Sequence, residues 1–188
     1  MISNHWLQEA KKVLSPNFNE RPDRSQIDLL VIHCISLPPG QYGGSCISDF
    51  FANRLNVNAH PYFKRIAKLK VSAHLLIERS GQVIQFVGFD KRAWHAGESC
   101  FMGDVGCNDF SIGIELEGAE DESFEICQYQ KLAEVSVALM CAYPAITRER
   151  IAGHSDIAGA RKTDPGLCFD WEFYRRLLNQ YPRRVPGS

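Results

Sequence analysis

Two histidines and one aspartate in this chain could together hold a catalytic metal ion. His33 ends an apolar run, His154 stands in Gly-His-Ser-Asp, and Asp164 stands in Lys-Thr-Asp-Pro-Gly. Two imidazoles and one carboxylate leave the fourth position of a tetrahedral zinc site free, which distinguishes a catalytic site from a closed structural one. A single histidine such as His33 is more often a hydrogen-bonded side chain at a strand end, so the prediction of a metal-dependent hydrolase depends on all three residues.

The segment that carries Asp164 is expected to be stiff. Pro165 pushes the residue before it toward extended backbone, and Gly166 after it permits a turn. In an extended segment Lys162, two positions earlier, points to the same side as Asp164. The spacing therefore predicts an ammonium group beside the metal, where it can pair with an oxyanion.

Two strands are expected to carry further chemistry. Residues 27–33 are short, rich in β-branched side chains and almost entirely apolar, as in a central strand that is covered on both faces. Residues 111–117 alternate strictly, so their apolar members face a core while Glu115 and Glu117 face the opposite way. We expect chemistry on this polar face at Glu115, and we expect Glu117 to be a solvated residue of the same face.

The remaining pattern predicts one α+β domain over residues 1–188. A turn at residues 79–82 separates segments 71–77 and 83–87, which together read as a β-hairpin. Apolar residues at helical spacing over 125–143 indicate a helix that ends before Pro144. The expected organisation is completed by a short helix over 48–55, a long surface loop around 41–58, a final helix over 171–178 and a frayed tail over 182–188.

Charge, cysteines and hydropathy restrict the partners and the compartment. A formal net charge of -1 offers no electrostatic footprint for nucleic acid. The seven cysteines are odd in number, scattered and without a CxxC pair, which disfavours a disulfide framework and suits a reducing compartment. No secretory signal and no apolar stretch of membrane-spanning length is evident. We therefore expect a cytoplasmic protein that binds neither nucleic acid nor membrane.

Six segments, in this order, strongly resemble the AmpD family of zinc amidases. They are residues 31–33, 72–77, 94–97, 107–118, 153–154 and 161–166. These enzymes are cytoplasmic 1,6-anhydro-N-acetylmuramoyl-L-alanine amidases of Gram-negative bacteria, within a superfamily that includes T7 lysozyme and the peptidoglycan-recognition proteins. The combination of segments is specific, because it runs from the first central strand to Trp171.

The resemblance implies a fold, a cofactor and an activity. The expected fold is a mixed central β-sheet flanked by helices, with one zinc ion per chain in a monomer. The expected reaction is hydrolysis of the amide between the lactyl group of 1,6-anhydro-N-acetylmuramic acid and the L-alanine of muropeptides. Such a reaction belongs to cytoplasmic peptidoglycan recycling, and through removal of anhydro-muropeptides the resemblance also implies a role in β-lactamase regulation.

The resemblance also implies residue roles. His33, His154 and Asp164 would bind zinc, Glu115 would act as the acid/base residue, and Lys162 would stabilise the tetrahedral intermediate. Contacts with the substrate are expected from Trp94, His95, Asn108, Arg161 and His74. Alternatives stay open for three of these five: Trp94 as a core side chain, Arg161 as a surface arginine, and His74 as a residue behind the ligands rather than in contact with substrate.

Four positions depart from the usual AmpD pattern, at Cys34, Gly106, Ser155 and Gly159, and the first two bear on substrate recognition. Cys34 stands where an asparagine typically follows the first ligand, and Gly106 lies near a position where relatives often carry an arginine. These departures put recognition of the sugar and of peptide carboxylates in question. Because neighbours on a strand point to opposite faces, Cys34 is expected to point away from the metal.

Three other functions are compatible with parts of the pattern. A lytic amidase of the endolysin type would share the zinc chemistry but act on intact cell wall, and a non-catalytic peptidoglycan-binding module would lack the ligands. A cysteine hydrolase would pair Cys34 with His33, yet adjacent strand residues cannot form a nucleophile and base pair directly. The presence of all five polar residues, ligands and catalytic groups together, favours the enzyme.

Overall fold

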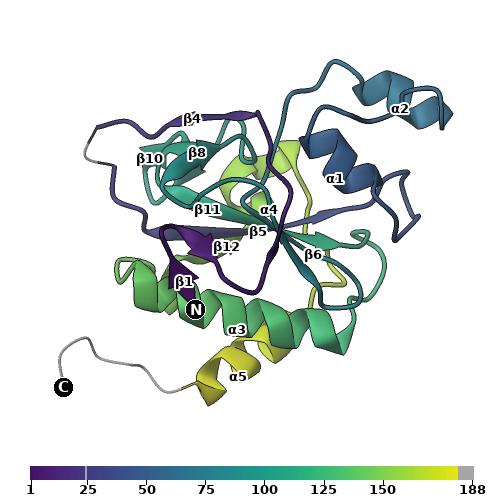
Figure 1. The fold of residues 1–188 in the computed structure, drawn as a ribbon. Helices are drawn as coiled ribbons and strands as arrows, with labels where there is room; N and C mark the ends of the chain where they lie inside the picture. The colour runs from purple at the N-terminus through teal and green to yellow at the C-terminus, as the bar shows by residue number, and fades with distance from the viewer. Residues whose placement is uncertain (24, 182–188) are drawn as a thin grey trace.

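A six-stranded mixed β-sheet forms the centre of the molecule (Figure 1). The computed structural model describes residues 1–23 and 25–181, so the tail predicted over 182–188 lies outside the described residues. The strand order is β12-β5-β11-β6-β7-β3. The strands are β3 (Lys11–Lys12), β5 (Leu29–Ile35), β6 (Leu75–Ile77), β7 (Val83–Gln85), β11 (Ser111–Glu117) and β12 (Ile151–Gly153).

Helices cover both faces of the sheet, which confirms the predicted α+β class. Helices α3 (Ile126–Ala142) and α5 (Trp171–Gln180) pack on one face, and α4 (His154–Ala158) lies on the other (Figure 1). The other helices are α1 (Cys46–Phe51), α2 (Pro61–Ile66) and three short 3-10 helices (Cys107–Asp109, Arg148–Arg150, Gly159–Arg161). Three two-stranded ladders pair β1 (Ile2–Ser3) with β2 (Trp6–Leu7), β4 (Phe18–Glu20) with β8 (Lys91–Ala93), and β9 (Cys100–Phe101) with β10 (Asp104–Val105). Across the described residues, no helix is both long and apolar enough to cross a membrane.

The apolar composition of the central strand β5 matches its burial between two neighbouring strands and under both faces of the sheet. Strand β5 pairs in parallel with β11 on one side and with β12 on the other, and its first five residues are buried. A strand buried on both faces has no polar face, so a continuous apolar run is what this position requires. The parallel register places Glu115 directly beside His33. Paired residues point to the same face of a sheet, so the two side chains enter the same space.

The predicted hairpin and the two long helices are confirmed. Strands β6 and β7 pair antiparallel, and α3 ends before Pro144 as expected. The side-chain Oε1 of Gln128 accepts a hydrogen bond from the backbone N–H of Glu125 at 3.0 Å, which caps the start of α3. The short helix predicted over 48–55 lies at Cys46–Phe51 instead, because Asn53 takes a left-handed backbone with φ of 58°.

The prediction that Glu117 is solvated was wrong. Its side chain is buried, and its two carboxylate oxygens accept hydrogen bonds from the backbone N–H groups of Gly43 at 2.6 Å and Arg79 at 3.0 Å. The loop after β5 folds over this end of β11 and excludes water from it. A buried carboxylate is tolerated here because both of its oxygens have donors.

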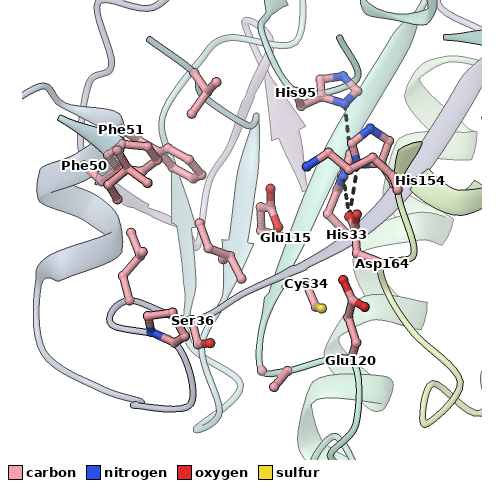
Figure 2. A pocket seen from close by; sticks show the side chains of 18 of the residues that line it. His33, Cys34, Ser36, Phe50, Phe51, His95, Glu115, Glu120, His154 and Asp164 are labelled. Atoms are coloured by element: carbon pink, nitrogen blue, oxygen red, sulfur yellow. Dashed lines mark hydrogen bonds and ion pairs between the residues drawn. The ribbon is translucent and has the colours of Figure 1, made fainter. Parts of the chain in front are cut away.

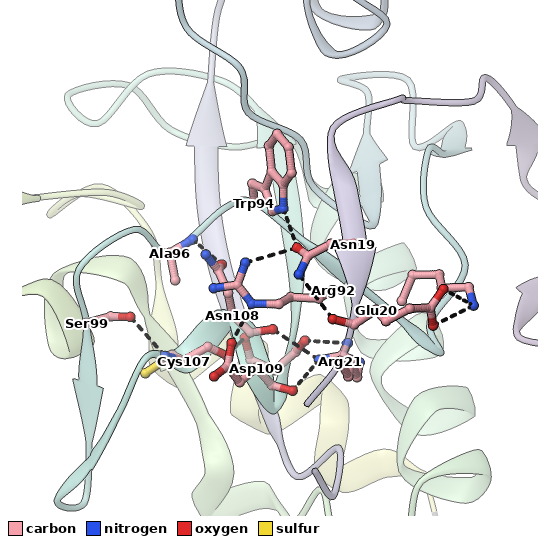
Figure 3. A network of polar contacts seen from close by, with 12 residues as sticks. Asn19, Glu20, Arg21, Arg92, Trp94, Ala96, Ser99, Cys107, Asn108 and Asp109 are labelled. Atoms are coloured by element: carbon pink, nitrogen blue, oxygen red, sulfur yellow. Dashed lines mark hydrogen bonds and ion pairs between the residues drawn. The ribbon is translucent and has the colours of Figure 1, made fainter. Parts of the chain in front are cut away.

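Arg21, which the sequence did not single out, holds together the segments around β11 (Figure 3). Its guanidinium donates hydrogen bonds to the backbone carbonyls of Phe89, Asn108, Asp109 and Ser111, over distances of 2.8 to 3.3 Å. Burial lowers the pKa of Arg21 to about 10, so the group is still charged at neutral pH. One side chain therefore supplies donors to backbone carbonyls of two segments, at Phe89 and at residues 108–111.

We predict that Arg21→Met lowers the free energy of unfolding by roughly 3 kcal/mol or more, because several buried carbonyls lose a charged donor at once. Chemical denaturation monitored by circular dichroism measures the change. Arg54→Met is the matched control, since Arg54 is exposed and its guanidinium forms a surface ion pair with Asp49 at 3.6 Å; it should shift stability by less than about 0.5 kcal/mol. Equal effects of the two variants would contradict the role assigned to Arg21.

Candidate active site

The three predicted ligands meet at the carboxyl ends of two neighbouring parallel strands. His33 lies near the end of β5, and His154 opens α4 directly after β12. Asp164 Oδ2 lies 3.1 Å from Nδ1 of His33 and 3.1 Å from Nδ1 of His154 (Figure 2). All three residues are buried, and one ligand atom from each lies within 4.8 Å of the others. The fold thus brings together residues that are up to 131 positions apart.

Glycine allows the Asp164 segment to approach His154. A Cβ added at Gly153 would come within 2.9 Å of the Pro165 ring, so a larger residue would push the segment away. The backbone N–H of Ser155 donates to the carbonyl of Asp164 at 2.9 Å and fixes the start of α4 against it. Lys162 is extended, as predicted, and lines the same cavity as Asp164.

The donor atoms of His33, His154 and Asp164 converge at a point where a cation fits. Nε2 of His154 lies 3.0 Å from the carbonyl oxygen of Ala96, which can only accept, so Nε2 carries a proton and, in the neutral ring, Nδ1 presents a lone pair. Burial favours the neutral form of Asp164, but its contacts with His154 and His33 outweigh this and hold the pKa of the carboxyl below its usual value. The two contacts at 3.1 Å bring both Nδ1 atoms onto one carboxylate oxygen. A metal ion would bind where these three atoms meet, and two imidazoles with one carboxylate form a suitable donor set.

Glu115 faces the ligands with unused hydrogen-bonding capacity. Its side chain is buried, and among the described residues no hydrogen-bond partner reaches its Oε2. Burial raises the pKa of Glu115 well above its usual value, the charge of Asp164 raises it further, and Lys162 acts in the opposite direction. A carboxyl with a raised pKa, without a partner and open to a cavity, is typical of a residue that exchanges protons with a ligand.

The site opens into a cavity of about 660 Å³ with two chemically different halves (Figure 2). One half carries the three ligands, Glu115 and Lys162. The other half is largely apolar, and no sequence pattern predicted it. Its lining comes from the end of β5, the loop after β5, helices α1 and α2, and the segment after α2 (Ile35, Leu37, Pro39, Phe50, Phe51, Tyr62, Ile66, Leu69, Val71). Apolar residues in short helices are an equally good signal for core packing, so no pattern in the sequence marks this wall.

Four of the five residues predicted to contact substrate separate into two groups. Trp94 and His95 line the cavity. Asn108 and Arg161 instead hold the backbone of residues 95–98. Asn108 Oδ1 accepts from the N–H groups of His95 and Ala96 (Figure 3), and Arg161 donates to the carbonyls of Ala96 and Glu98. Asn108 is buried and Arg161 is exposed, and neither is among the residues that line the cavity.

His74 has no surface available to a substrate. It is fully buried, its Nδ1 accepts from the N–H of Gly113 at 3.1 Å, and its Nε2 donates to the carbonyl of Lys91 at 3.0 Å. Burial lowers the pKa of His74 to about 3, so the ring is neutral. The expectation of substrate contact is corrected accordingly: both ring nitrogens are used inside the protein, on strands β11 and β8.

Cys34 does not have the environment of a nucleophile. It packs against the core between the sheet and α3 and also borders the cavity. Burial, followed by the charge of Glu115, raises the pKa of its thiol far above the usual value. Since the thiolate is the reactive form, the structure argues against a cysteine hydrolase.

The sequence is similar to proteins of known family over nearly its full length. A family model described as N-acetylmuramoyl-L-alanine amidase matches residues 23–167. The Citrobacter freundii protein named 1,6-anhydro-N-acetylmuramyl-L-alanine amidase AmpD is 52% identical over 178 residues, 95% of each chain. The protein of the same name from Escherichia coli strain K12 is 50% identical over 180 residues, 96% of this chain and 98% of the relative.

Solved structures agree with the sequence matches. A crystal structure of a selenomethionine derivative of AmpD aligns with a TM-score of 0.92 at 52% identity, covering 95% of this chain and 99% of that one. A complex of the Escherichia coli amidase AmiD with anhydro-N-acetylmuramic acid-L-Ala-D-γ-Glu-L-Lys aligns with a TM-score of 0.60 at 26% identity, covering 86% of this chain and 65% of that one. The mixed sheet flanked by helices is thus the amidase fold that the resemblance implied, and the chain belongs to the N-acetylmuramoyl-L-alanine amidase family.

Proposed function

We propose that this protein is a zinc-dependent amidase that cleaves the bond between the lactyl group of 1,6-anhydro-N-acetylmuramic acid and the L-alanine of muropeptides. The observation that carries the proposal is the convergence of His33 Nδ1, His154 Nδ1 and the ionised Asp164 carboxylate, with Glu115 beside them. The names of the relatives from Citrobacter freundii and Escherichia coli support the anhydro sugar as the substrate class. We propose that one domain acts as a monomer in the cytoplasm of a Gram-negative bacterium, in peptidoglycan recycling.

The residues around the ligands have distinct tasks in this reaction. A bound zinc ion would supply Lewis acidity, which polarises the amide carbonyl and makes a water molecule more acidic. The unpaired carboxyl oxygen of Glu115 is placed to accept a proton from the attacking water and then to return it to the leaving amine of L-alanine. The ammonium of Lys162 stabilises the negative charge that develops on the former carbonyl oxygen.

The apolar half of the cavity is the proposed site for the sugar. Trp94, whose Nε1 donates to Asn19 Oδ1 at 2.7 Å, presents a fixed aromatic surface, and aromatic faces suit the apolar faces of sugars. Asn108 and Arg161 contribute by holding the backbone of residues 95–98 rather than by touching the substrate. This arrangement excludes water from one side of the reacting amide.

The decisive experiment is cleavage of 1,6-anhydro-N-acetylmuramoyl-tripeptide by purified protein with a measured zinc content. A chelated sample, the non-anhydro muropeptide and intact cell wall are tested in parallel. Zinc-dependent release of the tripeptide, with strong preference for the anhydro sugar, is the expected result. Cleavage of intact wall alone would indicate a lytic amidase, and binding without cleavage would indicate a recognition module; either result contradicts the proposal.

We predict that Asp164→Asn destabilises the metal-free protein by about 1 kcal/mol, because the depressed pKa of Asp164 means that its ionised carboxylate is stabilised by His33 and His154 in the folded state, and the neutral amide loses that charge. The same change should abolish stabilisation by zinc, which for the unsubstituted protein is about 2.7 kcal/mol at a zinc concentration 100 times Kd. Thermal unfolding with and without zinc measures both effects. Asp104→Asn, at an exposed position of β10, is the control and should change neither.

We predict that Glu115→Gln lowers kcat by about 10²- to 10⁴-fold, the usual contribution of a general acid/base. Zinc content should be unchanged, since Glu115 is not among the three residues that form the metal group. Glu134→Gln, on the exposed face of α3 where Glu134 pairs with Lys131, should leave kcat unchanged. A near-normal kcat for Glu115→Gln would rule out its assigned role.

A further inference from the structure

We infer that Ser111 and His95 are positioning residues that fix the ring tautomer of His33 through a chain of hydrogen bonds, termed here the Ser111–His95–His33 chain. The chain begins at the backbone of Cys107 and ends at the nitrogen of His33 that faces Asp164. This inference rests on the proposed function, because the role of that nitrogen is to bind a metal ion. It gives His95 a task different from the contact with substrate that the sequence resemblance implied.

The direction of the chain is set at Ser111, the fully buried first residue of β11. Its Oγ lies 2.5 Å from the carbonyl oxygen of Cys107 and 3.1 Å from Nε2 of His95. A carbonyl oxygen can only accept, so the single hydroxyl proton of Ser111 is donated to Cys107. The lone pair that remains on Oγ must then accept from His95, which places the proton of the neutral ring on Nε2.

The same reasoning passes from His95 to His33. With its proton on Nε2, His95 presents a lone pair at Nδ1, which lies 3.0 Å from Nε2 of His33. His33 therefore donates from Nε2 and keeps a lone pair on Nδ1, 3.1 Å from Asp164 Oδ2. His154 reaches the same state by donating from its own Nε2 to the carbonyl of Ala96. Both imidazoles thus present an unprotonated Nδ1 to the metal position, as ligation requires.

Close contact with the backbone of β11 holds the His95 ring where its two nitrogens meet Ser111 and His33. A Cβ at Gly113 would lie 2.5 Å from Cγ of His95, so the ring rests directly on the backbone of β11 and only glycine leaves room for it. The backbone N–H of His95 donates to Asn108 Oδ1 at 3.1 Å. Because both ring nitrogens are engaged with Ser111 and His33, the His95 ring has no free nitrogen to offer a sugar.

The Ser111–His95–His33 chain is tested by Ser111→Ala, which removes the hydroxyl that sets the direction. We expect zinc affinity to fall by about 10- to 100-fold, the usual effect of removing a hydrogen-bond partner behind a ligand. Competition with a chromophoric zinc chelator measures the affinity. The matched control is Ser136→Ala: Ser136 is equally buried, but its Oγ hydrogen-bonds to the hydroxyl of Tyr174, between α3 and α5 and away from the ligands. This control should leave zinc affinity unchanged.

A second readout reports the tautomer itself. Nitrogen-15 NMR of the histidine rings in metal-free protein should show His33 with its proton on Nε2, and Ser111→Ala should increase the population with the proton on Nδ1. Ser136→Ala should not. A change of this kind does not follow from a general loss of packing.

Two substitutions at His95 test the link independently, and they do so even if Ser111→Ala does not fold. In His95→Asn the amide oxygen can still accept from Nε2 of His33, so zinc affinity should stay within about threefold of the original, less than the usual effect of losing such a partner. In His95→Leu no acceptor exists, and affinity should fall as in Ser111→Ala. Equal affinities for His95→Asn and His95→Leu, or an unchanged His33 tautomer in Ser111→Ala, would overturn the inference.

The outcome separates this inference from the proposed function. If the protein binds no zinc but the His33 tautomer depends on Ser111, the proposed function fails and the hydrogen-bonded chain stands. If zinc binds tightly and the His33 tautomer is the same in Ser111→Ala as in the unsubstituted protein, the proposed function stands and the inference fails.

Discussion

The parallel pairing of β5 with β11 and β12 is the constraint on which the site depends. The register sets Glu115 beside His33, and β12 ends one residue before His154, so three chemically active side chains emerge at one edge of the sheet. Parallel strands need long connections, and here these connections carry the cavity wall and the helices that cover both faces. The apolar side chains on the opposite face pack against α3 and α5, which fixes the edge in place.

Burying two carboxyl groups at that edge costs free energy. Burial disfavours the ionised form of Asp164, although its contacts with His33 and His154 offset this, and among the described residues Glu115 has no partner at Oε2. The unpartnered carboxyl of Glu115 lowers the stability of the folded protein. A folded domain can carry it because its large apolar core supplies the stabilisation elsewhere, and a cation bound by Asp164 and the two imidazoles would add to that stability.

Many polar side chains near the site form hydrogen bonds with backbone groups rather than facing the cavity. Arg21 satisfies the carbonyls around the start of β11, Asn108 holds the N–H groups of His95 and Ala96, and Arg161 holds the carbonyl of Ala96. That carbonyl in turn accepts from His154. The orientation of a ligand imidazole therefore depends on a loop whose shape is set by side chains that never reach the cavity, a pattern common behind metal ligands.

The sequence by itself determined the fold class, the main strands, the hairpin and the two long helices, because apolar periodicity and proline positions report local geometry directly. It also pointed to His33, His154, Asp164, Glu115 and Lys162 as one group, whose roles remain predictions. Only the tertiary structure decided which polar residues face the cavity. Asn108 and His74 were expected to touch substrate and Glu117 to touch water, but all three are enclosed. Burial and hydrogen-bond partners arise from segments distant in the chain, and no local pattern encodes them.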